Sequence, residues 1–470
     1  MKENHVPVLM FFVLAFIASW VAPIGNHNVV RPRPFISEFA AAEQPLDTGA
    51  CIQKFNAPCY QPRQIQRAYG LLSLFARGLD GSGRTIVIVN PYGSPTIEHD
   101  LHEFDHAFAL GDPPSFKIIQ PVGAVPPFDP DAAGGDELVW AKETTLDVEW
   151  AHVMAPGANI LLVETPVDET EGVQGFPEIV QAENYVIDHD LGDVISQSFG
   201  ATEATFPNRD AVLQLRSAFT NARDHRVTVL ASSGDTGATG FKSDQSCCYS
   251  NPAIVWPSSD PLVTSVGGTQ LHLDGDGYRT APDTGWNDAC ETSPTNCAGA
   301  SGGGPSAMFA RPSFQDAVEP IVGGRRGTPD LSMNSSFDSA VDIYYTFDKP
   351  ESPWHLAGAS SESSPLFAGV VAIADQAAGH RLGWLNPLLY GLPDAGVVDV
   401  ISGTNAFTYC SNECGTAREV DTTVPGYAAA PGYDLVSGLG TIDAARFVQA
   451  LARPNLDDNQ PADPRTSVSP

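Results

Sequence analysis

Short apolar runs alternate with helical patterns between residues 84 and 233 of this chain of 470 residues. The runs are rich in Val, Ile and Leu, as buried strands are, and apolar residues recur at helical spacing between them. Strands that alternate with helices form a parallel sheet covered on both faces. We therefore predict an α/β fold with a mostly parallel central sheet. The predicted strands are residues 84–90, 158–165, 193–199 and 227–233, and the predicted helices are residues 143–155, 178–189 and 210–223.

The chain is strongly acidic, with 56 Asp and Glu against 25 Lys and Arg and a formal net charge of −31. This charge argues against a nucleic-acid partner and against binding to an anionic membrane, because both need a basic surface. It suits a protein that works at low pH, where carboxylates protonate and self-repulsion falls. The content of 42% hydrophobic residues predicts one large globular domain, which we expect to be a monomer.

The two ends of the chain differ from its middle. An apolar run from Val6 to Ala22 follows Lys2 and predicts a signal peptide over residues 1–22, with an uncleaved signal anchor as the alternative. Both interpretations place the bulk of the protein outside the cytosol, so we expect a secreted, extracellular protein. We interpret residues 23–56 as a linker, residues 57–453 as the folded domain, and residues 454–470 as a disordered polar tail.

Eight cysteines support an oxidising compartment, because they fall into four close couples. None of the couples has the paired C-x-x-C pattern of a zinc site, so local disulfides are favoured over metal ligation. An adjacent pair needs a strained ring if its members bond to each other, so the pairing of Cys247 and Cys248 stays open. The couples are Cys51 and Cys59, Cys247 and Cys248, Cys290 and Cys297, and Cys410 and Cys414.

Three segments carry residues suited to catalysis. A Gly- and Ser-rich turn precedes an apolar helix and puts Ser361 at a helix N-terminus, where backbone amides stabilise developing negative charge. Glu143 and Asp147 lie four residues apart, on one face of a predicted helix, so their carboxylates repel and their proton affinities split. Asp235 follows a predicted strand in a Gly-flanked turn. Taken singly, these are also an ordinary helix cap, an acidic helix face and a turn aspartate.

Together these segments resemble the sedolisins, the serine-carboxyl peptidases that share the subtilisin fold and act in acid. The motifs occur in the family's order: E-x-x-x-D, then SxSFG and SSGD, then SGGG, then the serine turn that ends in Pro365. The resemblance extends from residue 60 to residue 447 and covers nearly the whole predicted domain. It implies a three-layer subtilisin-like fold and hydrolysis of protein or peptide substrates.

The resemblance also implies a role for each residue of the site. Glu143 would be the general base, Asp147 its hydrogen-bonded partner, Asp235 the oxyanion-hole acid and Ser361 the nucleophile that forms an acyl-enzyme. A carboxylate can act as a base at acid pH, whereas histidine would be protonated there and could not accept the serine proton. The segment SGGGPS resembles the family's substrate-binding edge strand. The substrate-binding residues implied there are Ser301, Gly302, Gly303 and Gly304.

A structural calcium ion is implied as the one cofactor. Asp399 and Asp434 match the family's two ligand aspartates, and backbone carbonyls would complete a shell of oxygen atoms, as a hard cation requires. The carbonyls implied are those of Val400, Ala430 and Gly432. Family members usually have Gly where this chain has Ala430, which matters little for a carbonyl ligand.

The sequence departs from the family pattern in three further places. Ser360 stands where Thr is common, and Glu362 beside the nucleophile is unusual and could modulate local acidity. The span between the predicted signal and the domain is too short for the family's long prosegment, so we expect no full-length prosegment.

We predict a secreted, acid-acting serine-carboxyl endopeptidase. A tripeptidyl exopeptidase of the same family and an inactive binding protein with the peptidase fold are the alternatives. A subtilisin-type Asp-His-Ser enzyme is disfavoured, because Asn90 stands where subtilisins place their aspartate and Glu143 where they place their histidine.

Overall fold

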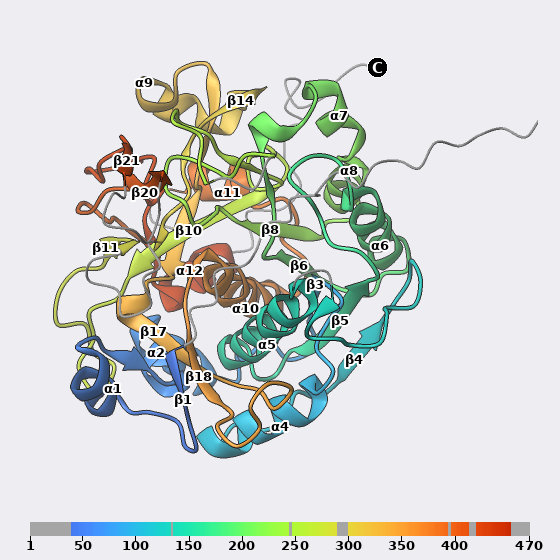
Figure 1. Cartoon of the computed structure of the whole chain (residues 1–470), viewed down its shortest axis with the longest axis vertical. Helices are drawn as coiled ribbons and strands as arrows, with labels where there is room; N and C mark the ends of the chain where they lie inside the picture. Colours follow the sequence, from blue (N-terminus) through green and yellow to red (C-terminus); the bar gives the residue numbers. More distant parts are fainter. Residues whose placement is uncertain are drawn as a thin grey trace, which may run out of the picture.

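The computed structural model describes residues 39–132, 135–243, 247–288, 299–392, 396–412 and 420–452. Its main sheet has eight strands in the order β11-β10-β8-β6-β3-β5-β4, with β16 also paired to β10 (Figure 1). All pairs are parallel except that of the short edge strand β11. The predicted parallel sheet is therefore confirmed. Its strands are β3 (Thr85–Pro91), β4 (Phe116–Ile119), β5 (Asn159–Thr165), β6 (Val194–Gln197), β8 (Thr228–Ser232), β10 (Thr264–Gln270), β11 (Thr284–Gly285) and β16 (Leu331–Asn334).

Helices cover both faces of this sheet, because the side chains of each central strand alternate between two apolar cores. On β3, Ile86 and Ile88 join the core beneath helices α5 (Asp136–Met154) and α10 (Ser360–Ala378). Val87 and Val89 join the core on the other face, beneath α6 (Phe176–Asp188) and α8 (Ser217–Asp224). The result is the three-layer α/β architecture that the alternating pattern predicts.

The predicted helix over residues 210–223 is two helices, α7 (Arg209–Gln214) and α8. The break falls at Leu215 and Arg216. The Arg216 guanidinium is buried and binds both carboxylate oxygens of Asp260. This buried bidentate pair ties the chain to the neighbouring loop at the break.

The predicted linker over residues 23–56 is too long. Strand β1 (Phe39–Ala42) pairs with β18 (Trp354–Ala357), and helix α1 (Thr48–Phe55) follows it. Asp47 caps α1 through a 2.7 Å hydrogen bond from the Ala50 amide. These residues belong to the folded domain, because sheet pairing and capping fix them. The predicted signal over residues 1–22, residues 23–38 of the predicted linker and the tail over residues 454–470 lie outside the described residues.

Two of the four cysteine couples lie in the described part of the chain. Cys51 bonds to Cys59 and connects α1 to strand β2 (Cys59–Tyr60), and Cys247, whose pairing the sequence leaves open, bonds to its neighbour Cys248. Cys290, Cys297 and Cys414 lie outside the described residues, so the last two couples are not described.

The remaining elements surround this framework. Among the residues that the structure describes, no helix combines the length and apolar character needed to cross a bilayer. These elements are β2 (Cys59–Tyr60), α2 (Pro62–Ala68), α3 (Leu71–Phe75), α4 (Ile97–Phe108), β7 (Ala201–Thr202), β9 (Val255–Trp256), β12 (Asn287–Asp288), β13 (Gly299–Ala300), β14 (Gly304–Ala310), α9 (Glu319–Val322), β15 (Arg325–Thr328), β17 (Ala340–Tyr344), α11 (Asn386–Gly391), β19 (Val397–Val398), β20 (Phe407–Asn412), β21 (Val420–Val424), β22 (Thr441–Ile442) and α12 (Ala444–Leu451).

Candidate active site

The serine turn precedes helix α10, which crosses the main sheet. Ala359 caps this helix with φ 96° and ψ 168°, a backbone conformation that residues with a side chain rarely adopt. Its amide donates a 2.6 Å hydrogen bond to the Ser335 carbonyl just beyond β16, which holds the turn in place. Such local strain is often found at functional sites. The turn presents Ser361 to a pocket, with only 4% of the residue exposed.

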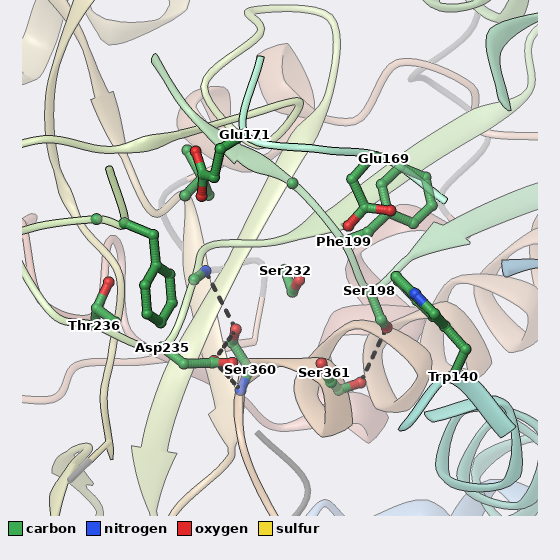
Figure 2. A pocket seen from close by; sticks show the side chains of 15 residues that line it. Trp140, Glu169, Glu171, Ser198, Phe199, Ser232, Asp235, Thr236, Ser360 and Ser361 are labelled. Atoms are coloured by element: carbon green, nitrogen blue, oxygen red, sulfur yellow. Dashed lines mark hydrogen bonds between the residues drawn. The ribbon is translucent and has the colours of Figure 1, made fainter. Parts of the chain in front are cut away.

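Pro365 leaves the carbonyl of Ser361 without its helical partner. Proline has no amide hydrogen, so it cannot donate to the carbonyl four residues earlier. The Ser198 hydroxyl lies 3.3 Å from that carbonyl oxygen (Figure 2), and it shares its single hydrogen between this oxygen and Asp147 Oδ1. Ser198 follows strand β6, so the first turn of α10 is fastened to the carboxyl end of a central strand.

Glu143 and Asp147 lie on α5, and both are fully buried. Burial and the nearby Asp147 carboxylate raise the pKa of Glu143 well above its ordinary value. The Ser361 hydroxyl lies close enough to lower that pKa in part. It makes no hydrogen bond of standard geometry, and both Glu143 oxygens are buried without a partner. Such contacts often tighten only when substrate binds.

Asp147 is held by neutral donors and makes no hydrogen bond to Glu143 in this structure. Asn90 donates to Asp147 Oδ2 over 2.9 Å and Ser198 donates to Oδ1 over 2.7 Å. Burial raises the pKa of Asp147 to about 7, and these two hydrogen bonds oppose the shift. Asn90 and Ser198 were not predicted as site residues. Their positions at the ends of predicted strands are the signal that could have found them.

Asp235 and Ser360 form the other side of the site. Asp235 Oδ1 accepts hydrogen bonds from the Ser360 amide over 2.8 Å and from the Ser360 hydroxyl over 2.5 Å (Figure 2). The Gly234 amide in turn donates to the Ser360 hydroxyl over 3.2 Å. Burial raises the pKa of Asp235, and the Ser360 contacts oppose the shift. Serine thus provides at position 360 the hydroxyl that the family's common threonine would provide.

A pocket lies beside Ser361, Ser360 and Asp235. Figure 2 shows Asp235, Ser360 and Ser361 along one side and two glutamates, Glu169 and Glu171, across from them. The glutamates lie on the loop between β5 and α6 and were not predicted, although an acidic run after a strand marks the loop in the sequence. The lining residues are Trp140, Glu169, Glu171, Ser198, Phe199, Gly200, Ser232, Gly234, Asp235, Thr236, Gly240, Phe241, Val255, Ser360 and Ser361.

The predicted substrate-binding segment, Ser301 to Gly304, lies behind the Asp235 turn. The Gly302 amide donates to the Gly234 carbonyl over 2.8 Å, and the Ser301 hydroxyl donates to the Val436 carbonyl over 2.7 Å. A Cβ on Gly302 would lie 2.0 Å from the Ser233 carbonyl oxygen, which is why glycine is required. The segment is absent from the pocket lining, and its direct contact with substrate stays a prediction.

The predicted calcium ligands come together around one loop. Asp399 accepts a hydrogen bond from the Gly432 amide over 2.8 Å, and Asp434 accepts one from the Ala430 amide over 2.9 Å. The Val400 carbonyl is linked to this cluster through the Ser437 hydroxyl over 3.4 Å. No group of three or more His, Cys, Asp or Glu side chains suited to a metal occurs in the described ranges.

Glu362 is directed toward Asn334 at the end of β16. Its Oε1 accepts a 2.9 Å hydrogen bond from the Asn334 amide group, and Oε2 is buried without a partner. Burial raises its pKa well above the ordinary value. The structure describes no hydrogen bond between Glu362 and Ser361, so Glu362 anchors the first turn of α10.

Comparison with known proteins places this geometry in a family. No family model matches the chain. It is 29% identical to kumamolisin of Bacillus sp. (strain MN-32) over 409 residues, covering 86% of this chain and 65% of kumamolisin. It is 30% identical to tripeptidyl-peptidase SED4 of Arthroderma otae over 488 residues, covering 89% of this chain and 72% of that protein.

Among solved structures, the chain resembles Pseudomonas sedolisin, a serine-carboxyl proteinase complexed with two molecules of pseudo-iodotyrostatin. The TM-score is 0.67 at 26% identity, covering 84% of this chain and 98% of that one. The fold and site therefore define a subtilisin-like α/β protein with Ser361 and Asp235 at one pocket and a buried Glu143–Asp147 pair near the serine. The chain belongs to the sedolisin family. It spans about two thirds of the length of kumamolisin and of Pseudomonas sedolisin.

Proposed function

We propose that this chain is an acid-acting serine-carboxyl endopeptidase that hydrolyses peptide bonds in protein or peptide substrates. One observation carries the proposal. Ser361 at a strained helix turn and Asp235 line one pocket, and Glu143 of a buried carboxylate pair lies close enough to Ser361 for the serine hydroxyl to lower its pKa. A nucleophile, a base and an oxyanion donor are the groups that acyl transfer needs.

Ser361 would attack the scissile carbonyl carbon while Glu143 accepts the hydroxyl proton. Two adjacent buried carboxylates repel, so the pair retains one proton over a wide pH range and its single charge serves as the base. Asn90 and Ser198 stabilise charge on the pair by donating to Asp147. Glu143 would then return the proton to the leaving amine, and water would hydrolyse the acyl-enzyme by the same route.

Asp235 would stabilise the tetrahedral oxyanion. Its Oδ1 is occupied by the two Ser360 donors, which leaves Oδ2 to carry a proton. Only the protonated acid can donate a hydrogen bond to an oxyanion, and burial favours that form by raising the pKa of Asp235. Activity therefore requires one charge on the Glu143–Asp147 pair together with a neutral Asp235, and we expect a maximum below neutral pH.

The test is digestion of an unstructured protein as a function of pH. Ser361→Ala is expected to abolish hydrolysis. Ser364→Ala, one turn further along α10 with its hydroxyl paired to Ser196, is the matched control and should retain it. Asp235→Asn keeps a hydrogen-bond donor but cannot titrate. The substitution should therefore weaken the decline of hydrolysis at high pH. Undiminished hydrolysis by Ser361→Ala, or a maximum at alkaline pH, would exclude the mechanism.

A tripeptidyl exopeptidase is the second candidate, because a tripeptidyl-peptidase is a relative at 30% identity. Sequencing the fragments from the same digestion separates the two activities. Internal fragments indicate an endopeptidase, whereas successive N-terminal tripeptides indicate the exopeptidase. No hydrolysis by the unmutated chain would favour the inactive binding protein.

We infer that one structural calcium ion binds at the loop around Gly432. Asp399 and Asp434 form no ion pair among the described residues, and burial raises the pKa of Asp434. A cation would compensate this desolvated charge, and carboxylate and carbonyl oxygens are its preferred ligands. We expect Ca²⁺ to raise the Tm of chelator-treated protein, and Asp399→Asn to weaken this response. A Tm independent of Ca²⁺ would contradict the assignment.

We also infer a secreted protein that acts as a monomer. The Cys51–Cys59 disulfide supports an oxidising compartment.

A further inference from the structure

The pocket beside Ser361 has an acidic wall that peptide-bond hydrolysis itself does not require. Glu169 and Glu171 line it across from Asp235 and Ser361 (Figure 2). A pocket that begins at the nucleophile accepts the side chain adjoining the scissile carbonyl, because that side chain is one bond removed from the attacked carbon. Its lining therefore determines which residue is cleaved.

Glu169 is a buried acceptor that makes no hydrogen bond of standard geometry, although the Gly200 amide lies close enough to lower its pKa. It is 1% exposed, and neither of its carboxylate oxygens has a hydrogen-bond partner in the described structure. Burying such a group without a partner is costly, and native proteins rarely do so without a functional reason. Gly175 fixes the loop, since a Cβ there would lie 1.9 Å from the Asp168 carbonyl oxygen. The Glu169 carboxylate is thus held at the pocket wall.

Glu171 is positioned by β7 (Ala201–Thr202). Its Oε2 accepts a 2.9 Å hydrogen bond from the Thr202 amide, and Oε1 lies 3.5 Å from the Thr202 hydroxyl. Two carboxylates therefore line the same pocket, one with partners and one without.

The rest of the pocket suits a long aliphatic chain. Trp140, Phe199, Phe241 and Val255 contribute apolar lining, and no lysine or arginine lines the pocket in the part of the chain described. Lysine and arginine side chains pack their aliphatic stems on apolar surface while the charged end reaches a polar partner.

We propose that this pocket selects a lysine or arginine side chain on the acyl side of the scissile bond, with Glu169 and Glu171 receiving its charged end. The inference rests on the proposed function and names its substrate class. An acidic side chain would meet two carboxylates of like charge, and a purely apolar one would leave Glu169 without a hydrogen bond of standard geometry.

The selection should strengthen with pH. Burial raises the pKa of Glu169 well above its ordinary value, and burial raises that of Glu171 to about 7. Asp168 adds to the shift of Glu169, while the Gly200 amide opposes it. The charge of Glu169 also raises the pKa of Glu143 on α5, the proposed base. A bound cation favours ionised glutamates, so binding of a basic side chain is coupled to proton release.

The experiment compares two fluorogenic peptides that differ only in lysine or norleucine on the acyl side. We expect kcat/KM for the lysine peptide to exceed that for the norleucine peptide by about tenfold or more. This ratio corresponds to the free energy of one hydrogen bond to a charged group. The preference should grow between pH 4 and pH 7. Glu169→Gln should reduce it about tenfold, because the amide carries no charge. The ratio cancels any change in Glu143, since both peptides use the same base.

Glu183→Gln is the matched control. Glu183 on α6 is equally buried, with both oxygens unpartnered, but lies outside the pocket lining. The lysine preference should survive this substitution. Equal cleavage of both peptides by the unmutated protein, or loss of the preference in Glu183→Gln, would overturn the inference while leaving the proposed function intact. Failure to cleave either peptide or any unstructured protein would overturn the proposed function as well.

Discussion

At the scale of single residues, neutral donors determine how the carboxylates of this site behave. Asp147 receives hydrogen bonds from Asn90 and Ser198, and Asp235 receives two from Ser360. Donors of this kind stabilise the charged form, whereas burial stabilises the neutral form. In the proposed mechanism, this balance would let one carboxylate pair serve as base while a nearby aspartate serves as acid.

Replacing Asn90 tests this balance. Asn90→Ala removes a donor to Asp147, so the pKa of the Glu143–Asp147 pair should rise. The decline of kcat/KM at low pH should move upward by about one pH unit, the equivalent of one hydrogen bond to a charged group. Asn184→Ala, on α6 and bonded to Ser217, is the control. An unchanged decline at low pH would show that Asn90 does not act on the base.

At the scale of elements, the site depends on the contact between α5 and α10. One helix carries Glu143 and the other Ser361, and they pack closely where Gly369 meets Met154. A Cβ on Gly369 would lie 2.4 Å from the Met154 Cβ. Glycine is therefore needed in the helix interior for close packing, although it lowers helix propensity.

Gly369→Ala should destabilise the protein despite the better helix propensity of alanine. Overpacking at this contact is expected to lower the free energy of unfolding by about 1–3 kcal/mol. It should also lower kcat, because it separates the helices that carry the base and the nucleophile. Ala377→Gly, at a half-buried position on α10, is the comparison and should lower stability with less effect on kcat. A higher Tm for Gly369→Ala in denaturation measurements would contradict the packing argument.

At the scale of the whole molecule, the structure combines a net charge of −31 with many buried carboxyl groups. Burial alone raises the pKa of Glu183 to about 8, and burial raises the pKa values of Glu149, Asp342 and Asp375 well above ordinary values. A carboxyl group with a raised pKa binds its proton more tightly in the folded state than in the unfolded state. The fold is therefore suited to acid.

Stability should consequently fall as pH rises. Between the ordinary carboxyl pKa near 4.5 and about 8, the folded state binds more protons than the unfolded state, so the free energy of unfolding decreases with pH. Tm should be higher at pH 4.5 than at pH 8. Glu183→Gln should weaken this dependence, because an amide at position 183 does not titrate. A Tm that rises toward pH 8 would contradict the raised pKa values.

Much of the fold could be predicted from local sequence patterns, and these patterns also provided candidates for part of the site. Alternating apolar runs predict the parallel sheet, because side-chain periodicity is a property of neighbouring residues. Motif order was sufficient to single out Glu143, Asp235 and Ser361. The limits of the predicted linker were wrong, since the pairing of β1 with β18 joins residues more than 300 positions apart, a partnership that no local pattern encodes.

What the sequence by itself determined, then, is the α/β framework, and it predicted the residues proposed to carry out acyl transfer. Only the tertiary structure decided that Asn90 and Ser198 hold Asp147, that Ser360 holds Asp235, and that Glu169 is buried without a hydrogen bond of standard geometry at the pocket wall. These relations depend on burial and on hydrogen bonds between distant strand ends. Both arise only when the sheet brings its carboxyl ends together.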